Sequence, residues 1–61
     1  MFIAIPAFPT GGAPATMLIN FDNVDSISDQ RGQTMIVFSD NDVLYTTLSL
    51  DEIYNLIVQE Q

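Results

Sequence analysis

The chain contains no cysteine, histidine, tryptophan or lysine, and its single basic residue is Arg31. Without cysteine it cannot form a disulfide or a thiolate zinc site. Without histidine, cysteine and lysine it lacks the usual nucleophile–base pairs and the amine nucleophile of enzymes. These absences argue against an enzyme, and no motif in the sequence indicates a cofactor or a metal.

Positive charge is almost absent, whereas eight acidic residues give a formal net charge of −7. A nucleic acid needs a basic surface to neutralise its phosphates, and an anionic membrane attracts basic segments. The composition therefore argues against direct binding of either. A charged partner should be a protein with a basic surface, although the acids also serve simply to keep a small apolar domain soluble.

No apolar run approaches the roughly 18 residues that span a bilayer, and Met1-Phe2 lacks the basic start of a signal peptide. We therefore expect a soluble protein in the cytoplasm of a bacterium or of an infected host cell. Residues 1–61 form one domain, and 48% of them are hydrophobic. A chain this short is marginally stable alone, so we expect a homo-oligomer, a dimer or higher.

The clearest local signal lies at the end of the chain, where residues 49–60 are predicted to form a helix. Ser49 and Glu52 have the spacing of a capping box, and Leu48 with Ile53 has that of a hydrophobic staple. The apolar positions then recur at helical spacing and predict one face packed on the sheet. These positions are Leu50, Ile53, Tyr54, Ile57 and Val58.

Two strands rich in β-branched and aromatic residues, 34–39 and 43–48, precede this helix and indicate a hairpin. A loop at Asn41-Asp42 pairs Phe38 with Tyr45, and Asp40-Asn41 is an almost equally good turn that gives another register. A one-residue slip of the pairing would exchange the faces. Both registers leave apolar side chains on both faces, which would suit a sheet covered by another subunit.

The first apolar run, residues 2–8, reads as a strand with both faces buried. It fits a central strand, an edge strand covered by a partner, or a strand exchanged between subunits. We place Phe2, Ile3, Ile5 and Phe8 among the candidate partner-binding residues. The proline- and glycine-rich stretch 9–16 reads as a loop; it matches no phosphate-binding motif, and contact with a partner is its alternative role.

Residues 17–20 and 24–28 complete the strands, joined by a bend that turns Val24 and Ile27 toward the core. Residues 29–33 read as a hairpin loop in which Gly32 supplies a positive φ and Arg31 lies at the tip. The predicted fold is α+β: a small antiparallel sheet of four or five short strands with one C-terminal amphipathic helix on one face.

The acids of the turns are the remaining candidates for chemistry. Asp22 with Asp25, and Asp40 with Asp42, form pairs, but acids in turns are usually solvated and bond local amides. Asp40-x-Asp42 opens like a calcium loop, yet Leu44 occupies the third ligand position and the motif fails. We therefore assign Asp22, Asp25, Asp40 and Asp42, with Arg31, to partner binding rather than to catalysis or metal binding.

From residue 17 to residue 58 the layout resembles the small FlbD-type flagellar accessory proteins. The matching positions are Ile19-Asn20, Val24, Ile27, the strand Met35–Phe38, and Ser49 with Glu52-Ile53. This chain lacks the basic residues common in that family, and its Asp40-Asn41-Asp42 turn replaces their Asn-Gly type. The resemblance implies a non-enzymatic accessory role with a protein partner, and it assigns no functional residue.

Three functions remain open from the sequence. The first is a non-catalytic acidic interaction module, a small inhibitor of the phage or mobile-element type that blocks a larger host protein. The second is a bacterial FlbD-like accessory or regulatory protein. The third is an oligomer that holds a small ligand between subunits, with Arg31 as the only charged group able to bind an anion.

Overall fold

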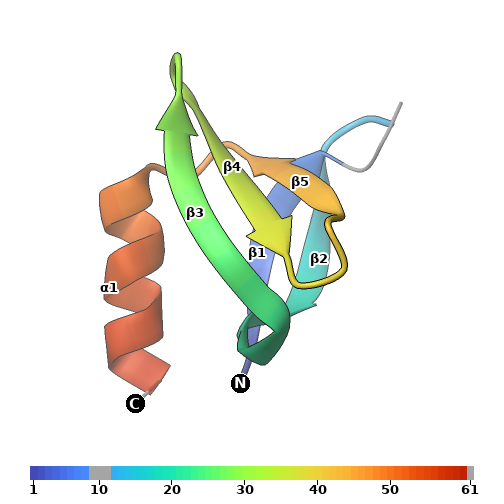
Figure 1. Cartoon of the computed structure of the whole chain (residues 1–61). Coiled ribbons are helices and arrows are strands. Elements are labelled where there is room, and N and C mark those ends of the chain that lie inside the picture. The colour runs from blue at the N-terminus through green and yellow to red at the C-terminus, as the bar shows by residue number, and fades with distance from the viewer. Residues whose placement is uncertain (9–11, 61) are drawn as a thin grey trace.

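The computed structural model describes residues 1–8 and 12–60, which form a curled five-stranded antiparallel sheet and one C-terminal helix (Figure 1). This confirms the predicted α+β fold. The strands follow the order β2-β1-β5-β4-β3 in the sheet. The elements are β1 (Phe2–Phe8), β2 (Ala15–Asn20), the 3₁₀ turn η1 (Phe21–Asn23), β3 (Val24–Gln30), β4 (Gln33–Phe38), β5 (Val43–Thr46) and α1 (Leu50–Glu60).

Strand β1 is a central strand, paired with β2 along most of its length and with β5 at Ala7 and Phe8. Ile3 and Ile5 are 6% and 0% exposed within the chain's own core. They are therefore unavailable to a partner, and their prediction as interface residues is wrong. Phe2 lies on the opposite face of β1 and is 60% exposed, as the alternation of side chains along a strand requires.

The core lies on the inner face of the curled sheet and is built mainly from β-branched and aromatic side chains. Its buried apolar members are Ile3, Ile5, Ala7, Ile19, Phe21, Ile36, Leu44 and Ile53. A bulge between Val24 and Ser26 allows both Val24 and Ile27 to pack against this core, as predicted. The turn between β3 and β4 consists of Arg31 and Gly32, both at positive φ (54° and 85°), the geometry of a type I′ hairpin.

The β4–β5 hairpin has neither of the two predicted registers. Ile36 pairs with Leu44 and Val37 with Val43. The reason is a three-residue loop: Asn41 adopts φ 71°, and its amide donates to the Phe38 carbonyl at 2.9 Å. A type I turn followed by a left-handed residue is a common three-residue hairpin, and it shifts the pairing from that of a two-residue loop.

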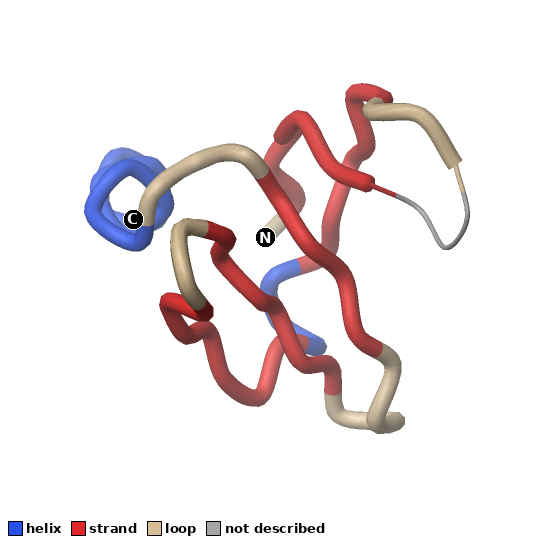
Figure 2. Tube along the Cα trace, turned by 90° about the horizontal axis from the view of Figure 1, so that it is seen from above, coloured by secondary structure: helices blue, strands red, loops and turns tan. Residues whose placement is uncertain are grey.

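The predicted capping box of α1 is present. The Ser49 amide donates to Glu52 Oε1 at 3.0 Å, and the Glu52 amide donates to Ser49 Oγ at 3.1 Å. The buried face of the helix is rotated from the predicted one, because Leu56 takes part in the packing and Tyr54 does not. The helix lies beside β3 in both views (Figures 1 and 2).

This rotation leaves an apolar row on the outer side of α1, which we call the helix row. Its members are Leu50, Tyr54 and Val58, which are 40%, 66% and 47% exposed. They are spaced four residues apart, so they lie one above another on one side of the helix. The prediction that these three side chains pack on the sheet is therefore wrong.

In the described part of the chain, no helix is long and apolar enough to cross a membrane. Residues 12–14 form an exposed connection, and β2 begins at Ala15, two residues before its predicted start. The rest of the predicted loop, residues 9–11, lies outside the described residues.

Candidate functional site

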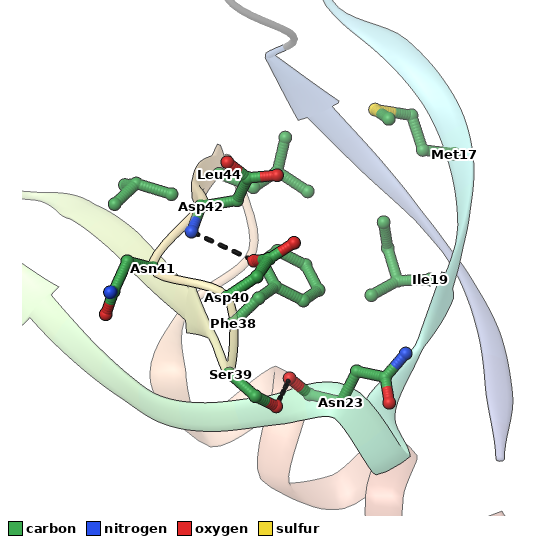
Figure 3. A pocket seen from close by; sticks show the side chains of 10 residues that line it. Met17, Ile19, Asn23, Phe38, Ser39, Asp40, Asn41, Asp42 and Leu44 are labelled. Atoms are coloured by element: carbon green, nitrogen blue, oxygen red, sulfur yellow. Dashed lines mark hydrogen bonds between the residues drawn. The ribbon is translucent and has the colours of Figure 1, made fainter.

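An open groove of about 760 Å³ lies between β2 and the β4–β5 hairpin (Figure 3). Its apolar floor comes from strands that the fold brings together from distant parts of the sequence. β2 supplies Met17 and Ile19, the end of β4 supplies Phe38, and β5 supplies Leu44. These side chains line the groove because the sheet curls enough to bring β2 opposite the hairpin.

The rim of the groove is polar and comes mainly from the hairpin loop, with one residue of η1. Its members are Asn23, Ser39, Asp40, Asn41 and Asp42. The loop is fixed to η1, because the Ser39 amide and hydroxyl both donate to the Asn23 carbonyl oxygen, at 2.8 and 2.7 Å. These two hydrogen bonds fix the position of the hairpin loop relative to η1 within the chain itself.

The two carboxylates of the rim are exposed, and neither forms a salt bridge within residues 1–8 and 12–60. Asp40 Oδ1 accepts the Asp42 amide at 3.1 Å, which stabilises the turn and leaves the other carboxylate oxygen free. No basic residue lines the groove. The site therefore combines an apolar floor with uncompensated negative charge at one side, a combination that suits a positively charged, partly apolar ligand.

The structure brings only two of the predicted partner-binding residues, Asp40 and Asp42, to this groove. Asp25 is exposed on β3, and Phe2 and Phe8 lie on β1, away from the groove lining. Arg31 is exposed in the β3–β4 turn, at the other end of β4 from the groove (Figure 1).

Asp22 has a local structural role. One of its oxygens lies 2.7 Å from the amino group of Met1, and the Asn20 side chain accepts the Asp22 amide at 3.1 Å. The Phe21 amide also donates to the Met1 carbonyl at 2.8 Å. Asp22 thus fastens the start of β1 to η1, and its charge is partly compensated there.

Sequence reasoning missed the apolar floor of the groove. Alternation along β2 does place Met17 and Ile19 on one face, but it cannot tell a covered face from one that borders an open groove. Among the described residues no three acidic side chains gather closely enough to hold a metal ion. The groove lining thus presents apolar, hydroxyl, amide and carboxylate side chains.

Comparison with protein-family models, with curated proteins and with solved structures found no match to this chain. The groove and the surfaces around it are therefore the basis for assigning a function.

Proposed function

We propose that this chain is a non-catalytic acidic interaction module whose groove binds an apolar, positively charged segment of a larger protein. The observation that supports this proposal is the groove itself. An apolar floor that includes Met17 and Phe38 lies beside the exposed carboxylates of Asp40 and Asp42, and no basic side chain lines it. Apolar burial would supply affinity, and the carboxylates would favour basic partners and disfavour acidic ones.

The module would act in the cytoplasm of a bacterium or of an infected host cell. An inhibitor of the phage or mobile-element type would use the groove to cover a basic site on a larger host protein. A FlbD-like accessory protein is the alternative, and the order of hairpin and capped helix after residue 33 agrees with that layout. A binder of small anions is not favoured, because Arg31 lies far from the groove.

We also propose that the chain forms homo-oligomers through the helix row of Leu50, Tyr54 and Val58. An apolar ridge at four-residue spacing is able to pack against the same ridge of a second copy related by a two-fold axis. Helix α1 lies on the opposite side of the molecule from β2 (Figure 1), so self-association through the helix leaves the groove accessible. A domain of this size also gains stability from assembly.

The groove is tested by capturing proteins from a bacterial lysate on three immobilised forms of the chain, followed by mass spectrometry. These are the wild type, Asp40→Asn/Asp42→Asn, and the control Asp25→Asn/Asp29→Asn. Both double variants remove two negative charges, and asparagine at position 40 keeps the acceptor for the turn. We expect proteins retained by the wild type and the control but lost with Asp40→Asn/Asp42→Asn. Identical capture by all three forms would count against the groove as the binding site.

A further inference from the structure

The free edge of the sheet at β2 has a defined set of outward-facing backbone groups. The Thr46 hydroxyl of β5 donates to the Pro6 carbonyl oxygen, so this carbonyl points toward β5 and away from β2. Pro6 is directly opposite Thr16 in the β1–β2 pair. Backbone groups in an antiparallel pair alternate between facing the partner strand and facing away. The N–H and C=O of Thr16, and those of Leu18 two residues later, therefore point outward from the sheet.

The two edges of the sheet differ in their protection. Strand β3 carries Asp25 and Asp29, contains the bulge near Ser26, and has α1 beside it. Strand β2 has the sequence Ala-Thr-Met-Leu-Ile-Asn, with no charge and no proline, and its register with β1 is unbroken. Charges, bulges and covering elements are the usual features that stop an edge strand from pairing with another chain. Among residues 1–8 and 12–60, strand β2 has none of them.

The groove lies directly beside this unprotected edge. Met17 and Ile19 alternate along β2 with Leu18, so they face the groove while the backbone of Leu18 faces outward. We infer that the partner segment binds as an additional strand on β2, with apolar and basic side chains on the face that borders the groove, the apolar ones over its floor and the basic ones near Asp40 and Asp42. This inference rests on the proposed function and specifies the partner as an extended peptide in which every second residue is apolar or basic.

Charge favours such a peptide over a second copy of the same chain. Strand β2 of a second copy would bring no basic residue to the carboxylates of Asp40 and Asp42, and each copy carries a net charge of −7. A basic segment instead compensates the exposed carboxylates, and its association should weaken at high salt.

The test uses the complete chain and a synthetic eight-residue peptide with blocked ends, in which every second residue is threonine and the four positions between them carry two valines and two lysines, so that valine and lysine share one face. Binding is measured by calorimetry. Two further peptides carry N-methyl groups on all threonines, or on all valines and lysines. In a strand, each set of amides faces one edge only, so strand addition predicts that one isomer loses at least about tenfold in affinity and the other does not. The Thr16→Pro variant removes an outward N–H and should also lose about tenfold, whereas Thr16→Val should bind as the wild type does. Thermal unfolding of both variants verifies that they are folded.

The outcomes separate this inference from the proposed function. Saturable binding below about 1 mM, lost for one N-methylated isomer and weakened in Asp40→Asn/Asp42→Asn, supports both. Binding that is weakened in Asp40→Asn/Asp42→Asn but equal for the two isomers overturns strand addition and leaves the groove as a binding site. No binding of any peptide, together with no groove-dependent capture from lysate, overturns both. Loss of self-association in Thr16→Pro would show that β2 pairs with a second copy, which also overturns the inference.

Discussion

The hydroxyl group of Thr46 joins three parts of the chain. It donates to the Pro6 carbonyl oxygen of β1, and it accepts the Leu48 amide at 3.2 Å in the segment that leads to α1. Thr46 is 0% exposed. A buried hydroxyl with both partners in place orients β1, β5 and the approach to the helix at a single point.

Replacing Thr46 with valine should therefore destabilise the chain by about 1–3 kcal/mol, because the partly buried Pro6 carbonyl and Leu48 amide would lose their hydroxyl partner while the side-chain shape is conserved. Urea unfolding measures this difference. Thr46→Ser keeps the hydroxyl and should lose less, and Thr47→Val, at the exposed neighbouring position, is the matched control. Equal stability of Thr46→Val and the wild type would show that this hydroxyl does not stabilise the fold.

Removal of the helix cap in Ser49→Ala should destabilise the chain by about 1 kcal/mol, because the Glu52 amide would lose its acceptor. The Glu52→Gln variant keeps an oxygen that accepts the Ser49 amide, so it should retain most of the stability. The free energies of unfolding of the two variants and the wild type are measured by urea unfolding and fitted with one common m value. A larger loss in Glu52→Gln than in Ser49→Ala would contradict the capping geometry.

Asn41 is the residue that sets the hairpin register, since its φ of 71° lies in the left-handed region. Asn41→Val should cost about 1–2 kcal/mol, because a β-branched side chain is strained there. Asn41→Gly should be neutral or stabilising, because glycine adopts this conformation without strain. Thermal unfolding measures the stability of the two variants. A valine variant as stable as the glycine variant would argue against this loop conformation.

The helix row predicts the assembly state in solution. Light scattering at micromolar concentrations should give the wild type a mass above that of one chain, and Tyr54→Glu should give a monomer, because it places a charge in the proposed interface. Asn55→Glu adds the same charge next to the row and should assemble as the wild type does. A wild type that stays monomeric throughout this range would rule out the helix row as an oligomer surface.

The features that the sequence predicted correctly depend on residues close together in the chain. Ser49 and Glu52 are three positions apart, and Gly32 lies in a turn between two short strands, so local chemistry determines both. The hairpin register was wrong because both predictions assumed a two-residue loop, whereas the loop has three residues, with Asn41 at positive φ in its third position. The prediction of the buried helix face was wrong because packing on β3 decides that Leu56, and not Tyr54, is covered. The spacing of apolar residues in the sequence does not indicate this choice.

The groove could not be predicted for the same reason. Its floor and rim come from β2, η1 and the β4–β5 hairpin, which meet only when β1 and β5 pair. The sequence did identify Asp40 and Asp42 as candidate partner contacts. It also suggested Ile3 and Ile5, whose burial became evident only once β1 was placed in the centre of the sheet.

The bond between Thr46 and Pro6 spans 40 residues of sequence. During synthesis β1 would therefore leave the ribosome long before β5, which pairs with it at Ala7 and Phe8. Until β5 is available, β1 would be paired with β2 alone, and its apolar side chains would be poorly covered. Chains held together by such distant pairings tend to fold slowly, and an isolated hairpin has little stability of its own. The native sheet would then form only once β5 has been synthesised and is able to pair with β1.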